Sequence, residues 1–109
     1  MLSCMPKYLY AYRGGSTPES EEEQQAVMAR WTGWFGQLGP AVVDGGNPFS
    51  VSATVGSDGS AGDGGASQLT GYSVVQADGL QAATEMAKGC PVLDAGGSVE
   101  VYEAFDVMG

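Results

Sequence analysis

The sequence predicts an α+β fold built as one domain. Its 109 residues match the length of a single domain that buries one modest core. Two hydrophobic patterns alternate along the chain: a period of two, typical of strands, and apolar residues three and four apart, typical of helices. The predicted order is strand, helix, strand, a short extra strand, and then strand, helix, strand. No internal repeat or second domain is visible in the sequence.

The first strand is predicted over residues 6–13, "PKYLYAYR". Its three tyrosines alternate with Leu9 and Ala11, so the tyrosines share one face of the sheet and the two aliphatic residues share the other. The tyrosines are Tyr8, Tyr10 and Tyr12. The following "GGSTPES" is predicted to be a loop.

A helix is predicted over residues 20–38. Ser20 and Glu23 have the spacing of a capping box, and the acidic residues of the first turn suit the positive end of the helix dipole. A single apolar stripe faces a core, and Gly39-Pro40 ends the helix. The stripe consists of Val27, Trp31, Trp34, Phe35 and Leu38.

The middle of the chain is rich in glycine. A short strand, "AVVD" over residues 41–44, runs into "GGNPF", and residues 51–55 form a weak further strand. Residues 56–67, "GSDGSAGDGGAS", have low complexity and are predicted to be a mobile loop or the tip of a long hairpin. The spacing of Asp58 and Asp63 in this loop lacks the later ligands of an EF-hand, so no metal site is predicted.

The last third of the chain repeats the strand–helix–strand order. A strand is predicted over residues 70–77, and residues 98–105 form a closing strand with Val99 and Val101 on one face. Between them, Asp78 is predicted to cap a helix, with Gln81 at the box position and Gly89 at the C-cap. The apolar stripe of this helix is Leu80, Ala83, Met86 and Ala87.

This order is the split β-α-β pattern of the ferredoxin-like βαββαβ fold. An antiparallel sheet then carries both helices on one face. We expect the tyrosines of the first strand to lie on the other face. Because burying one aromatic side chain contributes about 1.5–3 kcal/mol, we expect a second subunit or a ligand to cover that face.

Charge and composition exclude several classes of partner. Four basic and thirteen acidic residues give a net charge of −9, which repels phosphate backbones and anionic membrane surfaces. No apolar run approaches the roughly 18 residues of a membrane span, and the start of the chain is not typical of a signal peptide. We expect residues 1–5 to be disordered. Cys4 and Cys90 form no CxxC motif and are interpreted as reduced thiols of a cytoplasmic protein, with a disulfide between them as the alternative.

The chain contains no histidine. This excludes Ser-His-Asp and Cys-His catalytic units and every histidine-ligated metal site. Neither GxGxxG nor GxxxxGK[ST] occurs, so no cofactor is predicted. Any proton transfer would have to use a carboxylate, a tyrosine, a lysine or a thiol.

Two parts of the sequence each have two interpretations. Asp44 shares a face with Val42 if the strand is regular, and apolar neighbours would raise its pKa and suit a general acid or base. Alternatively, Asp44 opens a turn and accepts hydrogen bonds from the amides that follow. Trp31 and Trp34, three residues apart, either fill the core or form the wall of an apolar pocket.

The assembled pattern resembles the YCII-related family, in its DGPF-domain branch, over nearly the whole chain. The segments that carry the resemblance are "PKYLYAYRGG" at 6–15, "MARWTGWFGQLG" at 28–39, "VVDGGNPF" at 42–49, "DGGASQLTGYSVVQADGLQAATEMAKGCPVL" at 63–93 and "GGSVEVYE" at 96–103. The resemblance implies a ferredoxin-like domain that pairs, sheet facing sheet, into a dimeric α/β barrel. The name-giving "DGPF" has its counterpart in residues 63–66, which read "DGGA".

The resemblance also implies a site. Family members are proposed to carry a His-Asp pair in a pocket near the dimer interface, and Asp44 matches that aspartate. The histidine would fall near Arg30 or Trp31, and relatives often have a second histidine where this chain has Val92. Arg30 could hold an anionic ligand opposite Asp44, or pair with a surface glutamate. Bacterial members are often associated with sigma-factor regulators, which favours an accessory role.

Three functions follow as hypotheses. The favoured one is a homodimeric ligand-binding or accessory module with a small-molecule pocket near Asp44. The alternative is a small-molecule enzyme that uses Asp44 as a general acid or base, and the third is a structural dimer with no site. The predicted pocket residues are Arg30, Trp31, Trp34, Asn47 and Tyr72.

Overall fold

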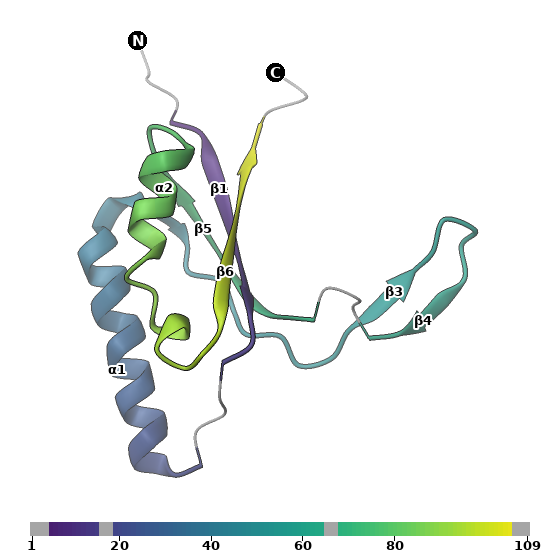
Figure 1. Ribbon diagram of the computed structural model, residues 1–109, viewed down its shortest axis with the longest axis horizontal. Helices are drawn as coiled ribbons and strands as arrows, with labels where there is room; N and C mark the ends of the chain where they lie inside the picture. The colour runs from purple at the N-terminus through teal and green to yellow at the C-terminus, as the bar shows by residue number, and fades with distance from the viewer. Residues whose placement is uncertain (1–4, 16–18, 65–67, 106–109) are drawn as a thin grey trace.

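The fold is a four-stranded antiparallel sheet with two helices on one face, and a small two-stranded hairpin stands apart from it (Figure 1). A computed structural model describes residues 5–15, 19–64 and 68–105 of the chain. The main sheet has the strand order β2-β5-β1-β6. Its elements are β1 (Lys7–Arg13), α1 (Glu21–Leu38), β2 (Val42–Asp44), β5 (Leu69–Gln76), α2 (Leu80–Ala87) and β6 (Ser98–Ala104).

This architecture confirms the α+β class and is compatible with the ferredoxin-like fold. β1 pairs antiparallel with both β5 and β6, and β2 pairs antiparallel with β5. Two single-turn helices, η1 (Gly39–Ala41) and η2 (Pro91–Leu93), follow α1 and α2 in the chain. The described residues form no closed barrel. None of their helices has the length and apolar character needed to cross a membrane.

The tyrosines of β1 lie on the helix-covered face, so the expectation that they occupy the open face is wrong. Tyr8, Tyr10 and Tyr12 are buried in the core, and the Tyr10 ring stacks on Trp34 with 6.0 Å between ring centroids. The Tyr10 hydroxyl donates to the Ala83 carbonyl oxygen of α2. Period-two alternation shows which residues share a face, but not which face the helices cover. Here the larger aromatic set is buried, where its hydroxyls also find acceptors.

The open face of the sheet carries the other half of each strand. Leu9 pairs with Val74 of β5 and with Tyr102 of β6, and Ala11 pairs with Tyr72. Since directly paired residues point to the same side, these side chains form one surface. Tyr102 is 52% exposed. The open face is therefore partly apolar, as expected, although different residues supply it.

Helix α1 begins and ends as its sequence predicts. The Ser20 hydroxyl accepts a hydrogen bond from the Glu23 amide at 3.1 Å, while the Glu23 carboxylate accepts one from the Glu19 amide at 3.1 Å. At the other end, Gly39 has a φ of 57° and its amide donates to the Phe35 carbonyl oxygen. These contacts satisfy backbone groups that a helix leaves unpaired at its ends.

Helix α2 is capped differently from the prediction. Gly79 occupies the N-cap position without a side-chain hydrogen bond, so the predicted cap by Asp78 is wrong. Asp78 lies one residue outside the cap, because the helix starts at Leu80. The C-cap is Lys88 rather than Gly89. After the helix, Cys90 is buried as a free thiol, whereas its possible partner Cys4 lies outside the described residues.

The glycine-rich middle folds further than a loop. β3 (Ala53–Val55) and β4 (Ala61–Asp63) pair antiparallel, so the hairpin-tip interpretation describes residues 56–60. Residues 65–67 of the predicted loop lie outside the described residues, as does part of the "DGGA" counterpart. The predicted disorder of residues 1–5 concerns mainly residues 1–4, which are also outside them.

Candidate functional site

A cleft of about 910 Å³ lies against residues 23–35 of α1. Its other walls are the 45–49 loop, the start of β5 and η2. The two helices differ in length: α1 has 18 residues, about 27 Å, and α2 has 8 residues, about 12 Å. Figure 1 shows α1 extending well beyond α2 along the sheet. The cleft occupies the part of the layer that α2 does not reach.

Small residues on the sheet keep this region open. On the helix-facing side of β5, Gly71 and Ser73 line the cleft, whereas Val75 further along the strand is fully buried in the core. Gly14, Gly15, Gly45 and Gly46 also line it. Large side chains on α1 therefore face a sheet floor with little volume to fill the space.

The helix side of the cleft is aromatic. The Trp31 ring meets Tyr12 edge-on at 5.1 Å and lies 5.8 Å from Phe35, measured between ring centroids. At the edge of the cleft, Phe49 stacks on Tyr72 at 5.8 Å with an interplanar angle of 19°. Both residues border the cleft, although pairing with Ala11 places the Tyr72 side chain on the open sheet face. Apolar and aromatic walls of this kind are typical of small-molecule sites.

The "DGGNPF" segment forms one wall because its backbone is held against β5. Gly46 has a φ of 75°, and a Cβ atom there would stand 1.8 Å from the Tyr72 carbonyl oxygen. Only glycine fits such an approach. The Phe49 amide donates to the Thr70 carbonyl oxygen at 2.9 Å, and Pro48 bridges to Gly71. Gly46 therefore allows the 45–49 loop to pack directly on β5.

A buried chain of hydroxyl groups fixes the same loop from below. The Tyr12 hydroxyl donates to Ser73 Oγ at 2.7 Å, and Ser73 Oγ donates to the Gly45 carbonyl oxygen at 2.6 Å. Ser73 is fully buried. Burial raises the pKa of the Tyr12 hydroxyl far above its ordinary value. These hydrogen-bonded hydroxyl groups therefore position the 45–49 loop. The Tyr12 hydroxyl stays protonated near neutral pH and does not act as an acid or base.

Asp44 has the geometry of a turn aspartate. Its Oδ1 accepts a hydrogen bond from the Gly46 amide at 2.9 Å, and its Oδ2 accepts one from the Tyr72 hydroxyl at 3.4 Å. The side chain is exposed and does not line the cleft. The expected shared face with Val42 is also wrong, because a register shift pairs Val42 with Val75 but Asp44 with Val74. Such an irregularity moves the following residue to the opposite face.

Four of the six predicted site residues meet in the cleft: Arg30, Trp31, Asn47 and Tyr72. Trp34 instead fills the core, where it is 4% exposed and its Nε1 donates to the Met86 carbonyl oxygen at 3.1 Å. Asp44 does not line the cleft, but it accepts a hydrogen bond from the hydroxyl of Tyr72, which borders it.

The charged groups of the cleft are Glu23, Arg30 and Asp94. Within the described part of the chain, the Arg30 side chain forms no ion pair or hydrogen bond, whereas Arg13 is paired with Glu100 at 3.4 Å. A guanidinium without a protein partner beside aromatic walls suits a planar anion such as a carboxylate.

Both positions at which the family resemblance implies a histidine belong to this cleft. Arg30 and Trp31 line it from α1, and Val92 lines it from η2. These residues give it a cation and apolar surface in place of imidazoles. Sequence analysis did not single out Phe49, Tyr12 or Phe35 as lining residues. Phe49 could have been found from the sequence, because it is an aromatic residue two positions after the predicted pocket residue Asn47.

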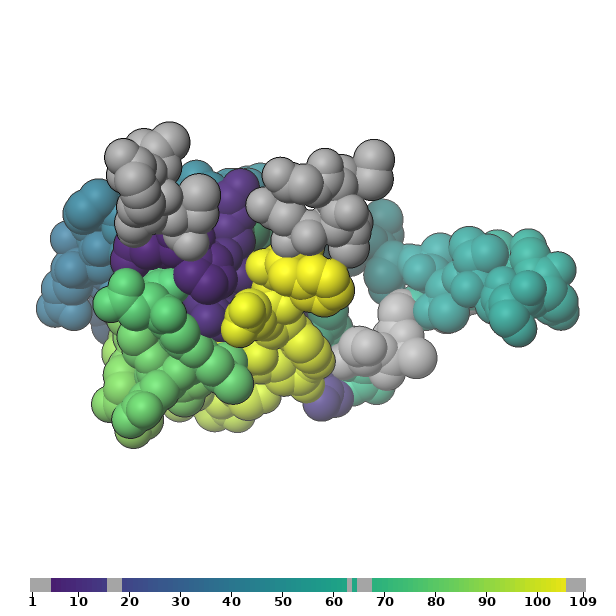
Figure 2. Space-filling view, turned by 90° about the horizontal axis from the view of Figure 1, so that it is seen from above, coloured from purple at the N-terminus to yellow at the C-terminus, as the bar shows by residue number. Residues whose placement is uncertain are grey.

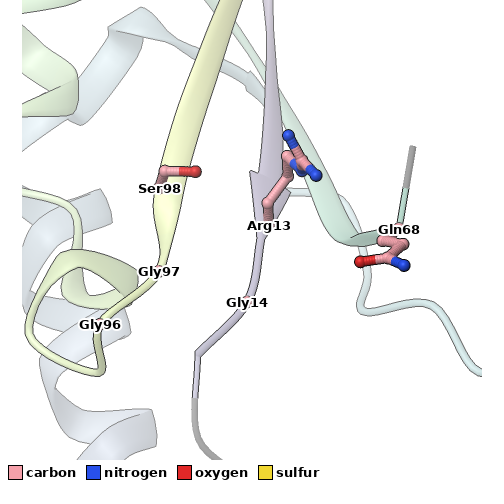
Figure 3. Close-up of a pocket in the computed structure, with 6 residues that line it drawn as sticks. All are labelled: Arg13, Gly14, Gln68, Gly96, Gly97 and Ser98. Atoms are coloured by element: carbon pink, nitrogen blue, oxygen red, sulfur yellow. The ribbon is translucent and has the colours of Figure 1, made fainter.

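A second hollow of about 280 Å³ lies where the ends of β1 and β6 meet. Figure 3 shows its lining: the side chains of Arg13, Gln68 and Ser98 with three glycines. Gly97 packs tightly there, since a Cβ atom would stand 2.4 Å from the Arg13 carbonyl oxygen. With little side-chain chemistry and its arginine already paired, this hollow is not the candidate site.

No metal centre is seen in the described ranges, which contain no group of three or more possible ligands among Cys, Asp and Glu. Asp58 instead accepts hydrogen bonds from the Ser60 amide at 2.9 Å and the Ser60 hydroxyl at 2.7 Å, and these bonds lower its pKa.

Comparison with known proteins adds no family name. No family model matches this sequence, and no curated protein matches it.

Proposed function

We propose that this chain is a ligand-binding or accessory module that holds a small organic anion in the cleft. The observation that carries the proposal is the placement of Arg30 beside Trp31 in a cleft of about 910 Å³. Small-molecule sites are mostly apolar, with a few polar groups that orient the ligand, and typically span about 300–1,000 Å³. Here Arg30 would bind the anionic group and Trp31 would contact the apolar body. Tyr72 would contribute at the cleft edge, and Asn47 would orient a further polar group.

Binding is favoured over catalysis because Asp44, the predicted general acid or base, does not line the cleft. Asp44 is exposed and engaged by the Gly46 amide, and the chain has no histidine. One contact keeps an enzyme as the second candidate: the Tyr72 hydroxyl, 3.4 Å from Asp44 Oδ2, links that carboxylate to a residue that borders the cleft. In that case Asp44 would act as a general acid or base through Tyr72.

We also propose that the chain is a YCII-related protein that forms a homodimer through its open sheet face, the sheets together making a dimeric α/β barrel. The partly apolar surface of Leu9, Val74 and Tyr102 supports this pairing. A cytoplasmic location is part of the same proposal, supported by the free, buried thiol of Cys90.

The test uses naphthalene-2-carboxylate and its neutral carboxamide as probes in calorimetric titrations. Arg30→Gln should weaken binding of the carboxylate about tenfold, equivalent to about 1.4 kcal/mol, and leave the carboxamide nearly unaffected. Lys88→Gln is the matched control, because it removes one positive charge outside the cleft from an exposed pair with Glu85. Equal binding of the carboxylate by the wild type and Arg30→Gln would overturn the assignment of Arg30.

Asp44→Asn separates the two candidates. As a binding module, the variant should keep its affinity for the probe within about twofold, because Asp44 does not line the cleft. As an enzyme, it should retain the affinity and lose turnover of whatever substrate a screen identifies. Turnover that depends on Asp44 would replace the binding proposal with the catalytic one.

A further inference from the structure

The hairpin of β3 and β4 stands away from the rest of the molecule. Its two strands pair only with each other and belong to a separate sheet. Figure 1 shows it projecting on the side of the main sheet opposite α1 and α2. Figure 2, seen from above, shows the same projection, with the helices at one end of the molecule and the hairpin at the other. The hairpin therefore reaches over the side that the helices leave open.

One face of the hairpin is aliphatic toward its tip. Val55 pairs with Ala61 and so shares its face, and Ala53, which pairs with Asp63 nearer the base, lies on the same side by strand alternation. The pairing continues toward the base, where the Gly64 amide donates to the Ser52 carbonyl oxygen at 3.0 Å. Val51 is 89% exposed and Val55 is 68% exposed. The opposite face carries Thr54 and Gly62, which pair with each other.

A hairpin of this kind needs a covering surface. An isolated two-stranded hairpin is at best marginally stable in water, and it becomes stable when its apolar face packs on another layer. The described residues of its own subunit leave Val55 68% exposed. Among these residues no surface stabilises the hairpin, which points to a surface of another molecule.

We propose that the hairpin is an arm that packs its Val55 face on a second copy of this chain. The inference rests on the proposed homodimer, in which the second copy lies on the open sheet face. Because the arm projects on that same side, a copy seated on the sheet lies beside it. In a twofold dimer each arm makes the same contact on the other subunit.

The size of the sheet face supports an arm. The four strands have 3, 8, 7 and 7 residues, in the order β2, β5, β1 and β6. At about 3.4 Å per residue and about 4.8 Å between strands, they cover roughly 400 Å² per subunit. A standard protein interface buries about 800 Å² per partner. The open face alone is thus about half of what a stable dimer needs, and the chain's net charge of −9 further opposes self-association. The arm extends the contact beyond the edge of the sheet and adds exposed apolar area to it.

The first experiment measures the dimer dissociation constant by sedimentation equilibrium. Val55→Asp should raise this constant at least tenfold, because it places a charge in the contact. Gly62→Asp is the matched control: it adds the same charge on the other face, where a Cβ atom meets nothing within 4 Å, and should change the constant less than twofold. A dimeric wild type with equal constants for both variants overturns the arm and leaves the homodimer standing. A monomeric wild type overturns both.

A second measurement shows the contact directly. A nitroxide is attached to the cysteine of Val55→Cys in a Cys4→Ser background, in which the buried Cys90 thiol is protected from the reagent. This spin-labelled chain is then mixed with a ¹⁵N-enriched chain that carries no nitroxide. Amide signals of the ¹⁵N subunit should broaden, since the label of one subunit lies on the other. Unchanged amide signals of the ¹⁵N subunit, in a sample shown to be dimeric, would overturn the proposal even if Val55→Asp disturbed the hairpin.

Discussion

Trp31 and Trp34 lie one helical turn apart on the same stripe of α1, yet they have opposite surroundings. Trp34 is sealed between Tyr10, Met86 and Gly89, with its indole nitrogen bonded to the Met86 carbonyl oxygen. Trp31 is only partly buried and forms a wall of the cleft. Both side chains project from the same face of α1, so the difference comes from the sheet and α2, which face that side of the helix.

The sheet and the second helix set that difference. Near Trp34, α2 closes the layer with Ala83 and Ala87, and β5 offers Val75. Near Trp31, α2 has ended and β5 offers Gly71 and Ser73. A helical stripe thus identifies residues that face inward, but whether they fill a core or line a site depends on the volume supplied by the facing elements.

Truncating each tryptophan should give the largest contrast. Trp34→Ala should reduce the free energy of unfolding by about 3–5 kcal/mol, since it empties a closed site. Trp31→Ala should cost about 1–2 kcal/mol, because part of its surface is already in water. Urea unfolding of both variants measures the two values. Equal losses would contradict the division into a closed and an open end.

Breaking the hydroxyl chain should have an intermediate effect. Ser73→Ala leaves the buried Tyr12 hydroxyl and the Gly45 carbonyl oxygen without their shared partner. We expect a loss of about 1–3 kcal/mol and weaker binding of the probe, because the 45–49 loop loses an anchor. Thr84→Ala serves as a control in chemical denaturation, since its hydroxyl bond to Leu80 is exposed. If Ser73→Ala lowers the free energy of unfolding no more than Thr84→Ala does, the hydrogen-bonded hydroxyl groups do not stabilise the 45–49 loop.

The buried core around Trp34, which includes Tyr10 and Cys90, should also determine how stability changes at high pH. Burial raises the pKa of the Cys90 thiol to about 11 and that of Tyr10 to about 12, from ordinary values of 9.0 and 10.0. Between pH 9 and 12 the unfolded chain loses these protons before the folded chain does. The associated stability is complete below pH 9 and is lost as pH rises through the raised values. Thermal unfolding midpoints should therefore fall over this range.

Cys90→Ala provides the control for this pH dependence. Without the thiol, the fall between pH 9 and 11 should be shallower than in the wild type. An identical slope in both proteins would show that the Cys90 thiol keeps its ordinary pKa in the folded chain.

Local patterns predicted much of the fold. Ser20, Glu23 and Gly39 mark the ends of α1 by contacts within a few residues, and the alternation in β1 and β6 appears in the structure. Properties that depend on distant partners were missed. The face on which the tyrosines are buried depends on where the helices pack, and the register shift before Asp44 depends on its pairing with β5.

For the candidate site too, the sequence predicted individual residues but not the space between them. Arg30, Trp31, Asn47 and Tyr72 were identified by residue type and position, and they lie together. The space between them was not foreseeable, because it arises from the different lengths of the two helices and from small residues on another strand. Trp34 shows the limit most clearly, since nothing in its own segment separates it from Trp31.

The most direct test follows the two indole N–H signals in a ¹⁵N spectrum while naphthalene-2-carboxylate is added, with Trp31→Phe used for assignment. If the cleft is the binding site, the Trp31 signal should shift progressively while the Trp34 signal, held by the Met86 carbonyl oxygen, stays in place. A Trp31 signal that does not move at millimolar probe would contradict the account, as would equal shifts of both signals.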